Sequence, residues 1–118
     1  MLATASEKEL IATTLVPADS YLEPATDAVE KLLTLLKKPN VHFANYDHEG
    51  TNPFPHDYRK DSHGLPKMPV FEGVNQSTVN VDTKLTAPEY LAQLLSGDTK
   101  YDVVETGPLT NIAEAIKI

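Results

Sequence analysis

The spacing of apolar residues in the first third of the chain restricts the fold more than any other feature. Residues 10–16, LIATTLV, form a short apolar run rich in β-branched residues that stops at Pro17, which predicts a buried strand. Over residues 24–38 the apolar residues recur at helical spacing, and residues 40–46, NVHFANY, return to a strand-like pattern. A strand, a helix and a strand in this order predict a βαβ unit with parallel strands.

Two signals compete for the start of the predicted helix. Ser20 and Glu23 have the spacing of a capping box, and Pro24 is equally suited to the first helical position. Pro39 marks its end, because proline cannot continue a helix.

The second half of the chain repeats the alternation after a long interruption. Residues 47–86 are rich in proline and glycine and predict one long irregular loop excursion. Helical patterns over 87–96 and 109–117 flank YDVVET, residues 101–106, which predicts a third strand. The whole pattern predicts one α/β domain over residues 1–118, with a three-layer Rossmann-like arrangement and a mainly parallel sheet.

Composition restricts the partners and the compartment. The formal net charge is −7, so the surface should repel nucleic acid and anionic lipid. No segment reaches the roughly 18 apolar residues of a membrane span, and the first residues lack the pattern of a signal peptide. The chain contains no cysteine, which excludes disulfides and thiolate metal sites. We expect a cytoplasmic protein without nucleic acid or membrane partners.

Polar residues follow each predicted strand. Asp19 follows the first strand, residues 45–61 follow the second, and Thr106 and Gly107 follow the third. Parallel sheets bind ligands outside the carboxyl ends of their strands. The three polar stretches should therefore converge on one edge of the sheet, around a ligand or a metal.

Three blocks of sequence, VPADSYLEP, GTNPFPHDYRKD and ETGPLTNIAEA, together resemble the nucleoside hydrolases. These calcium-dependent enzymes cleave the N-glycosidic bond of ribonucleosides. The blocks occur in the family's order over nearly the whole chain, and TGPLTN is specific for the family. NPFP followed by an acidic residue, an aromatic residue and arginine is similar to the purine-preferring branch.

The resemblance implies roles for single residues. Asp19 corresponds to the residue that hydrogen-bonds the ribose hydroxyls, and the main-chain carbonyl of Thr106 corresponds to a calcium ligand. Tyr58 corresponds to an aromatic residue that stacks on the base, and Asp57 to an acidic residue in the base vicinity. Asn52 belongs to the same predicted base-recognition loop and counts as a substrate-binding candidate.

Other residues that the family uses have no counterpart in this sequence. Nucleoside hydrolases carry an Asp-x-Asp and a paired Asp that supply most calcium ligands and the catalytic base, and the sequence contains neither pattern. It also lacks the downstream ribose-binding and late catalytic residues. The resemblance therefore implies an incomplete domain, about a third of a family member, with no catalytic residue of its own. Calcium would belong to the complete family site and not be retained by this chain alone.

Simpler interpretations stand beside these roles. Asp19 is suited to capping the following helix, and Tyr58 to anchoring its loop locally. The run Arg59, Lys60 and Asp61 is typical of a solvated charge run. A loop metal site is a further alternative, with loosely spaced candidate ligands: His48, Glu49, His56, Asp57 and His63.

Two functions remain open. In the first, the chain is a segment of a purine nucleoside hydrolase and is inactive in isolation. In the second, it is a truncated non-catalytic domain that binds nucleoside, ribose or another protein. In both, an open sheet edge and uncovered apolar faces predict self-association or pairing with the missing remainder of the domain.

Overall fold

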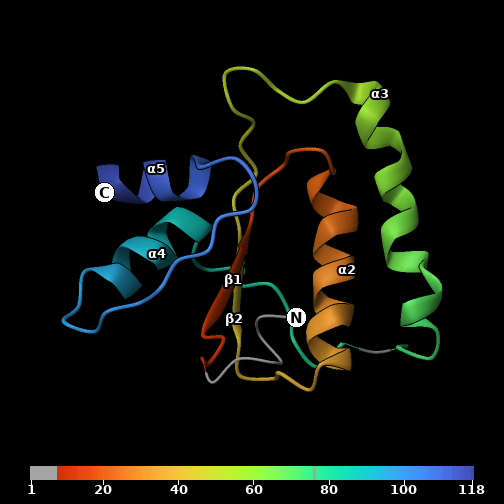
Figure 1. Ribbon diagram of the computed structural model, residues 1–118, viewed down its shortest axis with the longest axis horizontal. Helices are drawn as coiled ribbons and strands as arrows, with labels where there is room; N and C mark the ends of the chain where they lie inside the picture. The colour runs from red at the N-terminus through yellow and green to blue at the C-terminus, as the bar shows by residue number, and fades with distance from the viewer. Residues whose placement is uncertain (1–7, 76) are drawn as a thin grey trace.

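The computed structural model describes residues 8–75 and 77–118 (Figure 1). A central pair of strands has α2, α3 and η1 on one side in this view and α4 and α5 on the other. The elements, in chain order, are β1 (Ala12–Leu15), α2 (Leu22–Leu35), β2 (His42–Asn45), α3 (His56–Arg59), the 3-10 helices η1 (Lys60–Lys67) and η2 (Pro69–Phe71), α4 (Ala87–Leu95) and α5 (Thr110–Lys117).

The two strands pair in parallel, as the βαβ pattern predicts. Ala12 lies opposite His42, and Leu15 lies opposite Asn45. The amide of His42 donates to the Ile11 carbonyl, and the amide of Tyr46 donates to the Leu15 carbonyl, each over 3.0 Å. A small parallel α/β unit is therefore present, and its three-layer arrangement stays a prediction.

Helix α2 has different ends from those the sequence predicts. It begins at Leu22, with Tyr21 as N-cap and no side-chain cap, so Pro24 lies inside the first turn rather than at its first position. The hydroxyl of Ser20 donates to the Tyr21 carbonyl and does not cap the helix. The helix ends at Leu35 because Lys37 takes a positive φ of 53°, which breaks the helix before Pro39 is reached.

The core lies where α2 packs over the strand pair. Its buried members are Leu33, Val41, Phe43 and Val79. Phe43 is 1% exposed, and burying such a side chain contributes about 1.5 to 3 kcal/mol. Val79 comes from the long segment after η2, so this segment closes the core from a distant part of the chain.

The long segment 47–86 is more regular than the sequence predicts. It contains α3, η1 and η2, and η1 packs along α2. The prolines explain this structure: Pro55 precedes α3, and Pro69 opens η2. Proline suits the first positions of a short helix because its fixed φ is helical and its missing N–H is not needed there.

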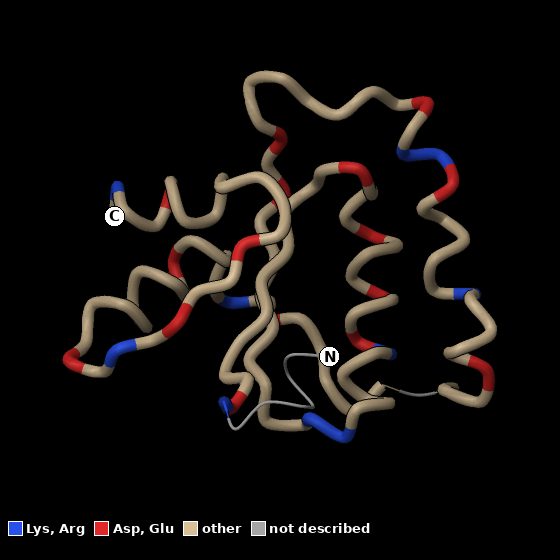
Figure 2. The backbone as a smooth tube through the Cα atoms, in the orientation of Figure 1, with Lys and Arg blue, Asp and Glu red and all other residues tan. Residues whose placement is uncertain are grey.

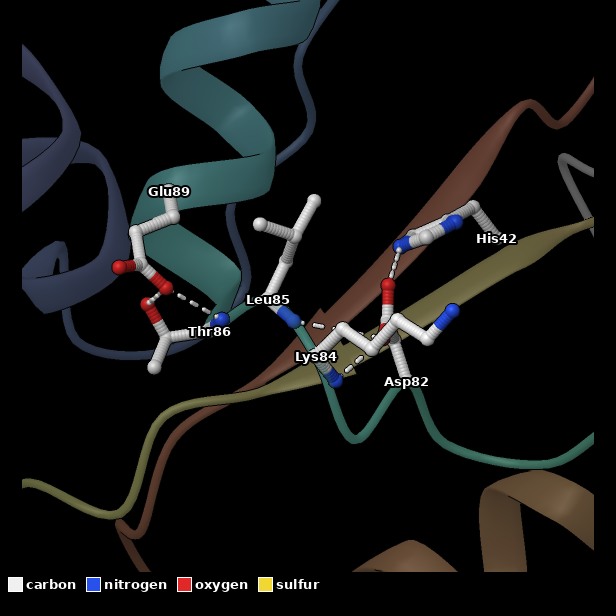
Figure 3. A network of polar contacts seen from close by, with 6 residues as sticks. All are labelled: His42, Asp82, Lys84, Leu85, Thr86 and Glu89. Atoms are coloured by element: carbon white, nitrogen blue, oxygen red, sulfur yellow. Dashed lines mark hydrogen bonds and ion pairs between the residues drawn. The ribbon is translucent and has the colours of Figure 1, made fainter.

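Residues around Asp82 fasten the end of this segment to β2 (Figure 3). The Asp82 amide donates to the Phe43 carbonyl over 2.6 Å, and Asp82 forms an isolated parallel bridge with Ala44. His42 Nε2 lies 3.2 Å from Asp82 Oδ2. The His42 ring stacks on Tyr90 of α4 with centroids 3.6 Å apart, which links the strand pair to the second half of the molecule.

Helices α4 and α5 pack against each other as a hairpin beside the strands (Figure 1). The start of α4 is set by a capping box between Thr86 and Glu89: the Thr86 amide donates to Glu89 Oε2 over 2.8 Å. This contact lowers the pKa of Glu89 below its ordinary value, because a backbone donor stabilises the carboxylate. The helix bounds agree with the sequence prediction to within a residue.

The predicted third strand is wrong. Residues 101–106 pair with no strand, and Val103 and Val104 are exposed. A strand needs a neighbour for its backbone groups, and none of the described residues supplies one at this position. The segment contacts the residues that precede β1 through an ion pair, in which Lys8 Nζ lies 2.5 Å from Asp102 Oδ2.

Acidic residues are spread over the helices and connecting segments, with fewer basic residues between them (Figure 2). No helix among residues 8–75 and 77–118 is long and apolar enough to cross a membrane.

Candidate functional site

The candidate site lies at the carboxyl edge of the strand pair. Because β1 and β2 are parallel, the segments that follow them leave the same end of the sheet, which is the upper end in Figure 1. The segment leading into α5 reaches this end as well. The polar stretches that the sequence predicts after β1, after β2 and before α5 therefore all begin near the carboxyl end of the strand pair.

A cluster of aromatic and basic side chains joins the loop after β1 to the segment after β2. We call it the Tyr21 cluster, and its members are Tyr21, His56, Arg59, Ser62 and His63. The Tyr21 ring stacks on His63, with centroids 5.3 Å apart at an interplanar angle of 27°. Its hydroxyl contacts His56 Nδ1, and its amide donates to the Ser62 hydroxyl over 3.3 Å. These contacts hold α3 and η1 against the first turn of α2.

Arg59 anchors the cluster from within. Its side chain is 4% exposed, and Nη1 pairs with Glu49 Oε1. Its guanidinium carbon lies 5.6 Å from the centre of the Tyr21 ring, within range of a cation–π contact. The interpretation of Arg59 as part of a solvated charge run is therefore wrong: the short helix α3 turns it inward, where Glu49 and Tyr21 compensate the buried charge.

The substrate-binding candidates surround this cluster at the surface. Asp57 and Tyr58 are neighbours on α3, Asn52 precedes it, and Asp19 lies in the loop that leads to Tyr21; all four are exposed. Tyr58 is 71% exposed and makes an edge contact with Phe54, with ring centroids 5.8 Å apart. The Tyr21 cluster thus connects the loop of Asp19 to the helix of Tyr58.

Thr106 lies on a separate segment. It is exposed, and no hydrogen bond, ion pair or ring contact of the described residues links it with Asp19 or Tyr58. Its neighbour Glu105 has a raised pKa because partial burial disfavours the carboxylate. The joint cavity of Asp19, Tyr58 and the Thr106 carbonyl stays a prediction.

The described residues do not by themselves form a metal centre. Within 8–75 and 77–118, no group of three or more histidine, aspartate or glutamate side chains is placed to hold an ion. Calcium takes six to eight oxygen ligands, and a single main-chain carbonyl at Thr106 does not provide them. The residues that the structure describes therefore do not fit a complete calcium site.

Sequence reasoning missed one feature of this edge, the Tyr21 cluster, because its contacts join segments far apart in the sequence and no residue spacing indicates them. Asn45, the last residue of β2, begins the polar stretch that the sequence predicts at this edge. Its amide nitrogen donates to Thr26 Oγ1 over 2.6 Å, while its buried Oδ1 has no hydrogen-bond partner among the described residues.

Comparison with known proteins agrees with the resemblance. Neither a protein-family model nor a curated protein matches the sequence. Among solved structures, the inosine-uridine preferring nucleoside hydrolase from Bacillus anthracis matches with a TM-score of 0.82 and 29% identity. The match covers 98% of this chain and 38% of that chain. The chain is thus similar over almost its whole length to part of a nucleoside hydrolase.

Proposed function

We propose that the chain forms part of the nucleoside site of a nucleoside hydrolase. The observation that carries the proposal is the match to a nucleoside hydrolase over 98% of the chain. The parallel pairing of β1 and β2 supports it, because the segments that follow the two strands leave the same edge of the sheet. The reaction of such an enzyme adds water to the ribose carbon of the N-glycosidic bond and releases the base. A cytoplasmic location and the absence of nucleic acid and membrane partners remain predictions from the sequence.

Asp19 is proposed to hydrogen-bond the ribose hydroxyls. It precedes α2, in the loop that the Tyr21 cluster holds against α3 and η1. A carboxylate that accepts hydrogen bonds from hydroxyl groups is worth about 1.5 to 3 kcal/mol when the site excludes water. This contact is common to all ribosides and carries no preference for the base.

Tyr58 is proposed to stack on the base, with Asp57 and Asn52 beside it. Its ring is largely exposed and so accessible to a base, and it makes an edge contact with Phe54. Stacking on an aromatic side chain contributes about 1 to 3 kcal/mol per base and grows with the area of the base, which favours purines. Purine preference is our proposal; the matching structure is of an inosine-uridine preferring enzyme.

The isolated chain is proposed to bind ribonucleoside weakly and not to hydrolyse it. The sequence has no Asp-x-Asp and no paired Asp, and the described residues form no metal-binding group. A reducing-sugar assay with inosine, adenosine, guanosine and uridine, with and without calcium, checks this point. Calcium-dependent turnover by the purified chain would refute it.

Binding itself is tested by NMR titration of the full chain with inosine, uridine and ribose. We expect Tyr58→Ala to weaken inosine about tenfold and to leave ribose unchanged, because only stacking is lost. Asp19→Ala should weaken all three ligands. Phe71→Ala, which removes an aromatic side chain from η2, is the matched control. Inosine shifts that are absent around Asp19 and α3, or equally reduced by the control, would contradict the proposal.

A further inference from the structure

One side chain of the Tyr21 cluster contacts both segments of the proposed nucleoside site. Tyr21 lies two residues after Asp19, in the loop between β1 and α2. Its hydroxyl contacts His56 and its ring contacts Arg59, which are the first and last residues of α3. Tyr58 lies between these two residues on the same helix. Tyr21 therefore stands between the residue proposed to bind ribose and the residue proposed to stack on the base, but it has no assigned role.

Helix α3 depends on other segments for its position. It is a single turn of four residues, His56–Arg59, and a helix of this length is not stable in water without tertiary contacts. Its N-cap is Pro55, whose side chain cannot accept a hydrogen bond from the helix amides. The place and direction of Tyr58 are therefore set by the contacts that α3 makes with the rest of the chain.

Tyr21 provides contacts of this kind from the loop after β1. Its ring centre lies 5.7 Å from that of the His56 ring and 5.3 Å from that of the His63 ring. The buried guanidinium of Arg59 lies over the same ring, 5.6 Å from its centre. The Tyr21 amide also donates to the Ser62 hydroxyl in η1. Removal of this one ring would take a contact from three side chains of α3 and η1 at once.

We propose that Tyr21 is a positioning residue, which fixes Asp19 and Tyr58 relative to each other so that one nucleoside contacts both. The inference rests on the proposed function, because it requires these two contacts. A ligand with two linked parts gains affinity from the link only when the geometry lets both parts bind at once. A fixed geometry also lowers the entropy that is lost on binding. Tyr21 thus contributes to the affinity for a complete nucleoside and not to the affinity for ribose or base alone.

NMR titration of the full chain with inosine, ribose and hypoxanthine tests this role. Tyr21→Ala should weaken inosine about tenfold and change the affinities for ribose and hypoxanthine by less than about twofold, because each of these makes only one contact. Tyr21→Phe retains the ring and should keep the inosine affinity within about threefold of the wild type. Equal weakening of all three ligands would overturn the inference, because a general loss of structure has that effect.

Tyr90→Ala is the matched control. Tyr90 also stacks on a histidine, but its partner His42 is the first residue of β2, at the opposite end of the strand pair from the proposed site. This variant should leave the ratio of the inosine affinity to the ribose affinity unchanged. A change in this ratio as large as that caused by Tyr21→Ala would overturn the inference.

Hydrogen exchange without ligand tests the position of α3 directly. The Tyr58 amide donates to the Pro55 carbonyl over 3.1 Å, and it should exchange about tenfold faster in Tyr21→Ala than in the wild type. Unchanged exchange would overturn the inference, because α3 would then keep its position without Tyr21. A wild-type chain that binds no inosine would refute the proposed function and the positioning role with it. Equal inosine affinities of the wild type and Tyr21→Ala would overturn the positioning role alone.

Discussion

The two halves of the molecule have similar sequence patterns but differ in how their apolar residues are covered. In the first half, Leu33 and Phe43 are buried between α2 and the strand pair, and Val79 of the segment after η2 closes this core. In the second half, α4 and α5 cover each other, while Leu109 and Ile118 remain largely exposed and Ile116 is 81% exposed. An apolar stripe on a helix therefore predicts burial only where the fold provides a surface to receive it.

The largest expected contrast between the halves is in unfolding free energy. Phe43→Ala should lower it by about 3 to 5 kcal/mol, because it removes a fully buried ring and leaves a cavity. Ile116→Ala should change it by less than about 0.5 kcal/mol, because little buried surface is lost. Urea denaturation followed by circular dichroism measures both. Equal losses would show that α5 is covered in solution.

The second prediction is that a second copy of the chain covers the exposed apolar residues of α5 in solution. Exposed apolar residues of α5 should drive self-association, and Ile116→Glu should raise the dissociation constant about tenfold or more, since burying one such side chain is worth about 1.5 to 3 kcal/mol. Analytical ultracentrifugation measures the constant. Leu32→Glu, at an exposed apolar position of α2, is the matched control. A monomer at high concentration, or equal effects of both variants, would contradict the prediction.

The same comparison explains which elements could be predicted from sequence. LIATTLV and YDVVET are both strand-like, but only the first has a partner strand in the described structure. Strand formation depends on hydrogen bonds to another segment, which no local pattern contains. Helices α2, α4 and α5 were predicted to within a few residues because their backbone hydrogen bonds are local, whereas the short helices α3, η1 and η2 were not predicted. The early end of α2 escaped prediction because the positive φ of Lys37 is not encoded by its residue type.

The candidate site was predictable only in outline. The convergence of the loops after β1 and β2 follows from parallel pairing, which the βαβ pattern indicates. The inward turn of Arg59 and its contacts with Tyr21 and Glu49 depend on the path of α3, a single helical turn inside a segment predicted as irregular. Contacts between residues far apart in sequence are set by tertiary packing, which residue spacing alone does not specify.

A smaller effect is expected at the start of α4. Thr86→Ala removes the cap of this helix and should lower the unfolding free energy by about 1 kcal/mol. The effect should be local, with faster hydrogen exchange in the first turn of α4 and little change in β2. Thr83→Ala, in the turn that precedes the cap, is the matched control. Faster exchange throughout the core would show that the two halves unfold as one unit.

The smallest expected effect is a difference in acid sensitivity between Asp82 and Glu89, which lie in the two halves. The pKa of Asp82 is lowered below 3.8 chiefly because the Lys84 amide donates to its carboxylate, with further help from the Leu85 amide and the charge of His42. The pKa of Glu89 is lowered below 4.5 by the Thr86 amide and hydroxyl. A lowered pKa means that the native state favours the carboxylate. The stabilisation is therefore full above the unfolded pKa and is lost as pH falls through the folded pKa.

Protonation of each carboxylate should consequently weaken the hydrogen bonds that it accepts and lower the protection from exchange in its own region. Between about pH 5 and pH 3, the protection from exchange of the Lys84 and Leu85 amides, which donate to the Asp82 carboxylate, should fall in the wild type. Asp82→Asn should show low protection at these amides already at neutral pH, with a flatter pH profile. Glu89→Gln should do the same for the first turn of α4 and leave the Lys84 and Leu85 amides unaffected. Hydrogen exchange followed by NMR distinguishes the two sites. If either variant flattens the pH profile of exchange at both sites, the change is transmitted through the stacked rings of His42 and Tyr90. The two halves would then respond to acid as one cooperative unit.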